Sequence, residues 1–369
     1  MNRPCILLGN GARSNPALID QLCALGIPIL TTWMAADLLP EDDPVYCGRP
    51  GVYGQRAANI IQQKADRLYI FGARLDDGQV AYRIDRFAPD AVKYMFDVDP
   101  AELAKLPDGG LWKEFITDMR GNIREWMQLR PVSPDWLNWC KALYHRFRFE
   151  LDGVADAGYV DPFAFASDLS SYARNDDIII AGAGKAGETL MQAFKVKRGQ
   201  RFMTLSTNGA MGYDIPLSIG ACIATGRRVL CVTGDGGFQL NTPELEVIRR
   251  LKLPIQFFVH SNNGYGSIRA MQRARFNNVV GADPASGFTI PRLAELADCY
   301  GLSYNCIETL ERPHTFDGQI NELMVDPDYV QYPRVATTMI GGAFEQDDMS
   351  DMTPRLAPDE LRALMEWGV

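Results

Sequence analysis

The sequence predicts an α/β protein of two domains, each built on a parallel β-sheet flanked by helices. The first observation is the length of 369 residues, which favours two domains over one core. The second is an alternation of short β-rich runs and helical segments through the first 110 residues, which is typical of βαβ units. The third is a similar alternation that starts near Tyr159.

Residues 1–130 form the first predicted domain. Its segments alternate between strand and helix in the order PCILLGNG, PALIDQLCALG, PIL, RAANIIQQKA, RLYIFG and AVKYMFDVD. We expect them to form a parallel sheet of a six-stranded type. From about residue 111 the pattern becomes helical and aromatic, and Pro131 and Pro134 interrupt it. We therefore expect residues 131–157 to be a helical linker.

Residues 158–345 form the second predicted domain. Its segments run in the order DDIIIAGAG, PLSIGACIA, RRVLCVTGDGG, TPELEVIRRLK, PIQFFVHSNNG and RLAELADCYG, again strands and helices in alternation. Residues 346–369 are acidic and contain prolines. They are expected to form a surface tail or an arm that contacts a partner.

The composition excludes several classes of partner. A net charge of −9 and a pI near 5.0 argue against nucleic acid or an anionic membrane. No apolar run reaches the roughly 18 residues of a membrane span, and the first residues do not resemble a signal peptide. Eight cysteines are scattered without a Cys-x-x-Cys pair, which favours reduced thiols in a cytoplasmic protein and disfavours a zinc site.

Two predicted strands end in polar residues beside glycines. Asp235 lies in Gly-Asp-Gly after one apolar run, and Asn262 follows the next run, 27 positions later. Ligands bind beyond the carboxyl ends of strands in open parallel sheets, so both side chains are expected in one crevice. Hard oxygen donors without cysteine or histidine suit Mg²⁺ or Ca²⁺, and Mg²⁺ is often completed by phosphates. Backbone amides of the glycines can meet a diphosphate at the start of the following helix.

Gly-Asp-Gly, about 25 intervening residues and an Asn pair together resemble the binding signature of thiamin-diphosphate (ThDP) enzymes. The segment NGAMGYDIPLSIGACIA at 208–224 is similar to the cofactor-binding segment of acetolactate-synthase-like members. The stretch TTWMAADLLPEDDPVYCGRPGVYGQRAANIIQQKADRLYIFGARLDD is similar to the central domain of that family. The resemblance implies a central domain followed by a diphosphate-binding (PP) domain, with ThDP and Mg²⁺ as cofactors.

The resemblance also implies roles for individual residues. Asp235 and Asn262 would bind Mg²⁺ through side-chain oxygens and Gly264 through its carbonyl, with Ser261 standing where many relatives have the first Asn. Met211 would support the bent cofactor and contact its aminopyrimidine together with the Gly209 carbonyl. The other residues expected to bind the cofactor are Gly184, Lys185, Ala186, Ala210, Gly234, Gly236, Gly237, Tyr265 and Gly266.

The family activates ThDP with a glutamate on a pyrimidine-binding (PYR) domain, and we recognise no such domain in this sequence. We expect a separate PYR subunit to supply the glutamate, in a heterodimer or an α2β2 heterotetramer. With it, the protein would decarboxylate a 2-oxo acid such as pyruvate and transfer the acyl unit to a carbonyl acceptor. A simple 2-oxo acid decarboxylase subunit, a non-catalytic ThDP-binding or regulatory subunit, and a truncated relative stay open as alternatives.

FAD binding stays open as well. Some acetolactate-synthase relatives bind FAD in the central domain near the segment written GARLDDG here, with Arg74 as the residue to test, and others carry no flavin. The turn Gly9-Asn10-Gly11 lacks the full dinucleotide fingerprint. His260, which ends a predicted strand, is interpreted as a core residue rather than a catalytic one.

Overall fold

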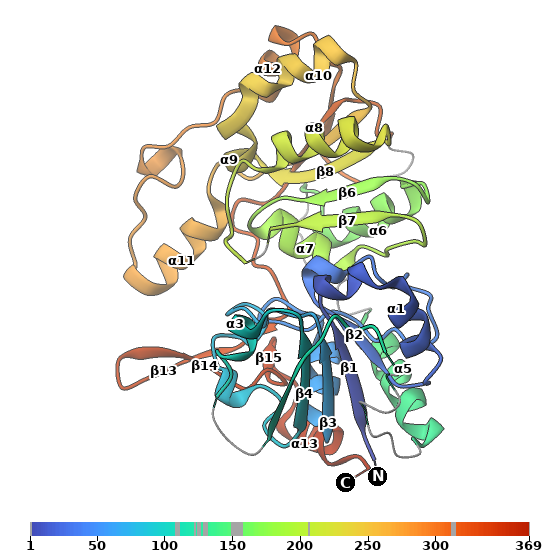
Figure 1. The fold of residues 1–369 in the computed structure, drawn as a ribbon. Coiled ribbons are helices and arrows are strands. Elements are labelled where there is room, and N and C mark those ends of the chain that lie inside the picture. The colour runs from blue at the N-terminus through green and yellow to red at the C-terminus, as the bar shows by residue number, and fades with distance from the viewer. Residues whose placement is uncertain are drawn as a thin grey trace. The chain divides into compact units, whose positions relative to one another are not determined.

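The computed structural model describes residues 2–107, 111–121, 123, 127, 132–148, 158–205, 207–310 and 315–368. The chain divides into two compact units (Figure 1). The first contains Met1–Glu150 together with Tyr332–Val369, and the second contains Leu151–Gln331. Both units are α/β, as predicted. Within the described ranges, no helix is long and apolar enough to cross a membrane.

The first unit is built on a parallel sheet in the order β2-β1-β3-β4-β5. Its strands are β1 (Pro4–Leu8), β2 (Ile29–Thr31), β3 (Arg67–Phe71), β4 (Val92–Asp97) and β5 (Trp112–Ile116). All residues of β1 and β2 are buried, as expected for strands of a parallel sheet that is covered on both faces.

Strand β5 corrects one sequence-based expectation. The helical pattern predicted from residue 111 begins with this strand, which pairs in parallel with β4. Its Phe115 stacks on Phe96 of β4 at 4.7 Å between ring centroids, and Phe96 stacks on Phe71 of β3 at 4.6 Å. Such cross-strand aromatic pairs favour strand pairing over a local helix. The described part of this sheet has five strands, where we expected a six-stranded type.

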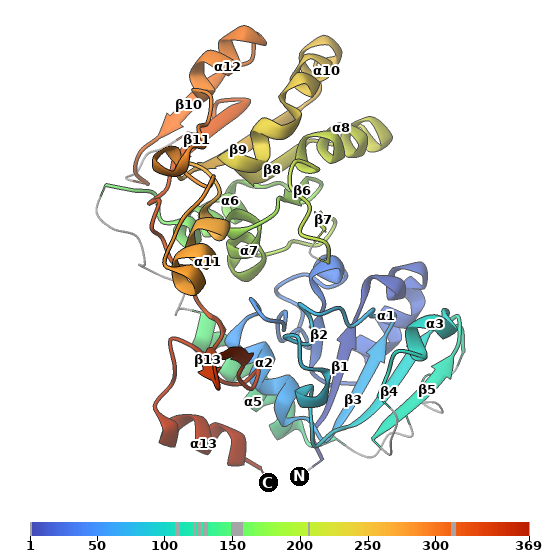
Figure 2. The same cartoon turned by 90° about the vertical axis from the view of Figure 1, so that its left-hand side faces the viewer.

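The helices of the first unit are α1 (Pro16–Cys23), α2 (Arg56–Lys64), α3 (Pro100–Leu103), α5 (Pro134–Arg148) and α13 (Pro358–Glu366). Helices α2, α5 and α13 gather on one side of the sheet (Figure 2). Every residue of α2 is buried although several are polar or charged. Buried polar groups need hydrogen-bond partners, and the end of the chain supplies many of them.

The end of the chain belongs to the first unit. It forms the strands β12 (Arg334–Val335), β13 (Thr337–Ile340), β14 (Ala343–Gln346) and β15 (Met352–Thr353) before α13. Arg56 of α2 donates to the Met352 carbonyl at 3.2 Å. Gln63 donates to Asp348 at 3.0 Å, and Lys64 donates to the Met365 carbonyl.

The boundaries of the two units therefore differ from the domain boundaries that we expected from the sequence. The described part of the expected linker 131–157 is largely α5, which belongs to the first unit. So does all of 332–369, which we had split between the second domain and a tail. The physical reason is long-range packing: the Trp136 indole donates to the Pro4 carbonyl at 2.8 Å, and Trp367 stacks on Trp139.

The second unit is built on a parallel sheet in the order β10-β11-β9-β8-β6-β7. Its strands are β6 (Ile178–Ala181), β7 (Arg201–Thr204), β8 (Val229–Gly234), β9 (Ile255–Ser261), β10 (Tyr304–Ile307) and β11 (Ile320–Met324). Because all pairs are parallel, the carboxyl ends of the strands meet at one edge.

Helices cover both faces of this sheet (Figure 1). Helices α6 (Pro162–Tyr172) and α7 (Lys185–Ala193) lie on one face, and α8 (Asp214–Thr225), α10 (Leu245–Leu251) and α12 (Leu293–Cys299) lie on the other. The one-turn helix α9 (Asp235–Phe238) and α11 (Gly266–Phe276) begin directly beyond strand ends. Apolar side chains of α8, α10 and α12 share a core with alternate residues of the central strands.

We predict that Trp136→Ala lowers the free energy of unfolding of the first unit by about 3–5 kcal/mol, because it empties a fully buried site and leaves the Pro4 carbonyl without its donor. Urea denaturation followed by circular dichroism measures the change. Ile116→Ala is the control, because its side chain is exposed on the edge strand β5 and should change stability by less than about 0.5 kcal/mol. Equal effects of the two substitutions would contradict the assignment of Trp136 to the core.

Candidate functional site

The residues singled out in the sequence gather at the carboxyl edge of the second sheet. Gly234 ends β8, and Asp235, Gly236 and Gly237 form the first residues of α9. Asn262 follows the end of β9, and Gly266 starts α11. Because β8 and β9 are neighbours in the sheet, the two strand ends are brought together as expected.

Asp235 connects the two strand ends. Its side chain is buried at 1% exposure. Carboxylate Oδ1 accepts from the Gly236 amide at 2.7 Å, and Oδ2 accepts from the amides of Asn262 at 3.0 Å and Gly264 at 3.1 Å. Burial raises the pKa of Asp235 to about 6, although these three amides and the nearby Arg269 oppose the change. Desolvation thus outweighs the three hydrogen bonds in setting the pKa of this carboxyl group.

Asn262 presents an amide oxygen that has no protein partner. Its side chain is 8% exposed, and no hydrogen bond to Oδ1 is found among the described residues. A buried acceptor left unpaired costs about 1–3 kcal/mol, which indicates a ligand at this atom. The backbone of Asn262 is fixed by Arg269, whose guanidinium donates to the Asn262 carbonyl at 3.0 Å and the Asn263 carbonyl at 3.3 Å.

The glycines allow close approach of the two loops. A Cβ at Gly236 would lie 2.5 Å from Cδ1 of Tyr265, and the Tyr265 ring stacks on Phe288 at 4.1 Å. Gly264 has φ +121°, and a Cβ there would lie 2.5 Å from the Ala282 carbonyl oxygen. Larger residues at these positions would force the loop of Asp235 and the loop of Asn262 apart.

A third loop reaches the start of α11. Gly184 has φ +78° and precedes α7, whose first residues are Lys185 and Ala186. The Lys185 amide donates to the Ser267 hydroxyl of α11 at 3.2 Å, so the first turns of two helices meet. The Lys185 ammonium donates to the Tyr329 carbonyl. Burial, together with the nearby charge of Arg269, lowers the pKa of Lys185 to about 8.

The loop with Gly209, Ala210 and Met211 is exposed. It lies between β7 and α8, and 43% of Met211 is accessible. The following residues are firmly held: Asn241 donates to the Gly212 carbonyl at 2.7 Å, and the Tyr213 hydroxyl donates to the Ala181 carbonyl. One end of this loop is therefore held by hydrogen bonds, while the Met211 side chain is accessible at the surface.

Several residues at the site were not predicted. Four of them make hydrogen bonds to partners that are distant in sequence, and no short motif marks them: Arg269, Ser267, Tyr213 and Asn241. Asp214 was visible as an acid inside the apolar run of α8, and it is buried. His260, as interpreted from the sequence, is buried beside Phe165. Burial lowers its pKa to about 4.

The donor set fits Mg²⁺ with a phosphate ligand. One carboxylate, one orphaned amide oxygen and one backbone carbonyl are hard oxygen donors, and such sites are completed by water and phosphate oxygens. No cluster of three or more histidine, cysteine or acidic side chains that could hold a metal occurs in the described ranges. The protein alone therefore provides a partial coordination shell rather than a closed metal cage.

At the corresponding edge of the first sheet, the turns that follow β1 and β3 lie close together. Strands β1 and β3 flank the point where the strand order reverses, where ligands bind in such sheets. A Cβ at Gly9 would lie 2.1 Å from the Gly72 carbonyl oxygen, and the Gly11 amide donates to that oxygen at 2.9 Å. Arg74 is largely exposed beside Glu102.

Two family models match the chain. Residues 1–114 match "Thiamine pyrophosphate enzyme, central domain", and residues 182–331 match "Thiamine pyrophosphate enzyme, C-terminal TPP binding domain". The second match contains all of the residues that the sequence predicted to bind the cofactor or the metal.

Curated relatives agree with these matches. The large subunit of acetolactate synthase isozyme 2 from Escherichia coli (strain K12) is 30% identical over 281 residues, which are 74% of this chain and 50% of the relative. The acetolactate synthase large subunit of Cyanidium caldarium is 29% identical over 314 residues, 81% of this chain and 52% of the relative. The chain spans about half the length of these relatives. It belongs to the thiamine pyrophosphate enzyme family and, within that family, is acetolactate-synthase-like.

Proposed function

We propose that the second unit binds the diphosphate of ThDP through Mg²⁺. The observation that carries this proposal is the arrangement of Asp235 and Asn262: a buried carboxylate joins two strand ends beside a buried amide oxygen that lacks a partner. The match of residues 182–331 to a TPP-binding domain supports it. Asp235, Asn262 and the Gly264 carbonyl would hold the metal.

The other site residues would place the cofactor. The Gly237 amide lies in the first turn of α9, where backbone N–H groups favour a phosphate, while the Gly236 amide donates to Asp235. Lys185 lies at the start of α7 and can turn its ammonium from the Tyr329 carbonyl to a phosphate oxygen. The exposed Met211 would support the bent cofactor, and the Gly209 carbonyl would contact its aminopyrimidine. When bound, ThDP supplies the electron sink for decarboxylation.

We further propose that the chain acts as the large subunit of a heteromeric, acetolactate-synthase-like enzyme. It would decarboxylate a 2-oxo acid such as pyruvate and transfer the acyl unit to a carbonyl acceptor. A separate PYR subunit would supply the glutamate that activates the cofactor, in a heterodimer or α2β2 heterotetramer. The similarity to acetolactate synthase large subunits supports the reaction class.

Asp235→Asn should lower the affinity for ThDP in the presence of Mg²⁺ by about 100-fold or more. The amide cannot accept from all three backbone donors and removes the charge that binds the metal. Equilibrium dialysis with ThDP and Mg²⁺ measures the loss. Asp298→Asn, a surface change on α12, serves as the control for the lost charge. Wild-type affinity in Asp235→Asn would refute the metal assignment.

Gly236→Ala should also weaken ThDP binding, by about tenfold or more, because its Cβ collides with the stacked Tyr265 ring and displaces the loop of Asn262. Gly220→Ala is the matched control, since a Cβ there meets nothing within 4 Å in the middle of α8. Titration calorimetry with ThDP and Mg²⁺ compares the two variants with the wild type. Equal affinities of all three would show that the approach of the two loops is not required.

The chain saturated with ThDP and Mg²⁺ should release no CO₂ from pyruvate above background. Addition of a separately produced PYR subunit should give activity, and replacement of that subunit's activating glutamate by glutamine should remove it. Coupled detection of CO₂, with mass spectrometry of the acyl-transfer product, provides the measurement. Decarboxylation by the chain alone would rule out the need for a partner.

A further inference from the structure

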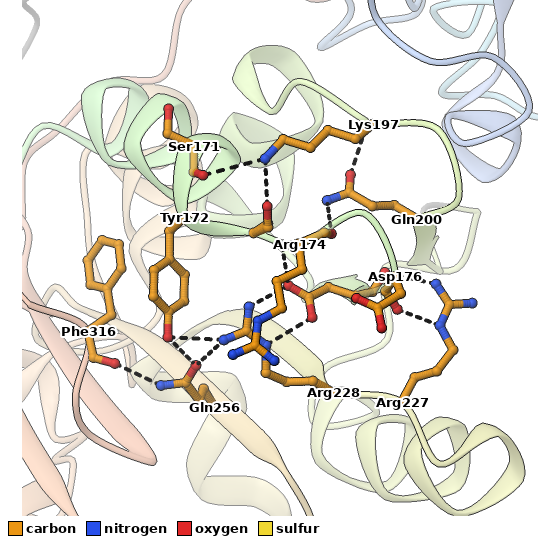
Figure 3. Close-up of polar contacts among 12 residues, drawn as sticks. Ser171, Tyr172, Arg174, Asp176, Lys197, Gln200, Arg227, Arg228, Gln256 and Phe316 are labelled. Atoms are coloured by element: carbon orange, nitrogen blue, oxygen red, sulfur yellow. Dashed lines mark hydrogen bonds and ion pairs between the residues drawn. The ribbon is translucent and has the colours of Figure 1, made fainter.

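Two buried carboxylates of the second unit have strong protein partners. Asp177 lies just before β6, at the amino edge of the sheet, and Arg228 binds it at 2.9 and 2.6 Å. Arg228 belongs to a dense network with Tyr172 and Gln256 (Figure 3). Asp235, at the carboxyl edge, accepts from three backbone amides. The oxygens of both carboxylates thus accept hydrogen bonds from the protein.

Asp214 is buried in the same unit without such partners. It is the first residue of α8, and 1% of it is exposed. Neither carboxylate oxygen has a hydrogen-bond partner among the described residues. An ionised carboxylate in this setting is strongly disfavoured. Burial raises its pKa, and the Thr233 hydroxyl and the first amides of α8 counteract the shift without meeting hydrogen-bond geometry.

The position of Asp214 connects it to the turn that would bind the diphosphate. A Cβ built on Gly237 would lie 3.9 Å from Oδ2 of Asp214, 3.4 Å from the Thr233 hydroxyl and 3.9 Å from the Gly212 amide. The carboxyl group thus lies next to the first turn of α9. A negative charge here would repel a phosphate at the Gly237 amide through a low-dielectric interior.

We propose that Asp214 is a neutral carboxylic acid whose proton is required for diphosphate binding at the Gly236–Gly237 turn. Asp214 is a positioning residue. When its carboxyl group carries a proton, the side chain next to the turn is uncharged, whereas the ionised carboxylate repels the anionic ligand. This inference rests on the proposed function, because it takes the turn to be a diphosphate site. Because binding requires the protonated form of Asp214, the affinity for the diphosphate falls as the pH rises and this carboxyl group loses its proton.

Asp235 and Lys185 titrate in the same pH range, since burial raises the pKa of the first to about 6 and lowers that of the second to about 8. Both are kept in Asp214→Asn, so the comparison with this variant isolates the effect of Asp214. Burial raises the pKa of Tyr213 to about 12 and holds that of Cys231 on β8 well above its usual range. Asp235 lies on α9, and His260 faces α6 across the sheet. The remaining charged side chains on the elements packed against α8 are on η5 (Gln239–Glu244) and α10, near the surface: Glu244, Glu246, Arg249 and Arg250.

The test compares wild type, Asp214→Asn and Asp298→Asn by titration calorimetry between about pH 6 and pH 9.5, with ThDP plus Mg²⁺ and with inorganic pyrophosphate plus Mg²⁺. The asparagine keeps the shape and stays neutral. At low pH, Asp214→Asn should bind like the wild type. As pH rises, the wild type and Asp298→Asn should lose up to about tenfold more affinity per pH unit than Asp214→Asn. Parallel curves for all three proteins would overturn the proposal.

Infrared difference spectra of the ligand-free chain, wild type minus Asp214→Asn, provide a second readout that needs no cofactor. We expect a protonated-carboxyl band near pH 6 that disappears at higher pH. Its absence would overturn the proposal even if ThDP binds. If the wild type binds neither ligand at any pH, the proposed function fails, and the infrared band alone decides whether Asp214 is the neutral acid.

Discussion

The carboxylate of Asp235 links the ends of two strands, and the geometry of the candidate site depends on that link. One oxygen accepts from the amides of Asn262 and Gly264, which lie beyond β9, while the residue itself begins the helix after β8. Hydrogen bonds to a charged group contribute about 1.5–3 kcal/mol each. Even so, the pKa of this carboxyl is raised to about 6, so the cost of burial exceeds the gain. Such a perturbed pKa is typical of functional sites.

The surrounding residues keep the two loops at this distance. Arg269 holds the carbonyls of Asn262 and Asn263 from α11, and the absence of a side chain at Gly236 makes room for Tyr265. Among the described residues, the amide oxygen of Asn262 has no protein partner, which supports the proposal that it binds a metal. The cost of the unpaired oxygen is carried by the rest of the fold.

The first unit shows another use of long-range contacts. Helix α2 presents charged and amide side chains to the interior, and the last residues of the chain satisfy several of them. Trp367 completes the aromatic stack with Trp139 and Trp136. Residues 332–369 are therefore part of the core architecture of this unit, although their acidic, proline-containing sequence is typical of a surface tail.

The sequence by itself determined the α/β class, the two-unit organisation and the pairing of Asp235 with Asn262, because hydrophobic periodicity and glycine-flanked strand ends are local patterns. It did not reveal β5, the place of the last residues or the roles of Arg269 and Tyr213, because these depend on partners far along the chain. Asp214 shows the difference most clearly. The sequence shows this acid within an apolar run. Only the tertiary structure shows that both of its oxygens lack partners among the described residues and lie beside the turn of Gly237. The Asp214 carboxyl group becomes buried next to that turn only when α8 packs against β8 and α9. Its burial and its distance to the turn decide whether it keeps its proton.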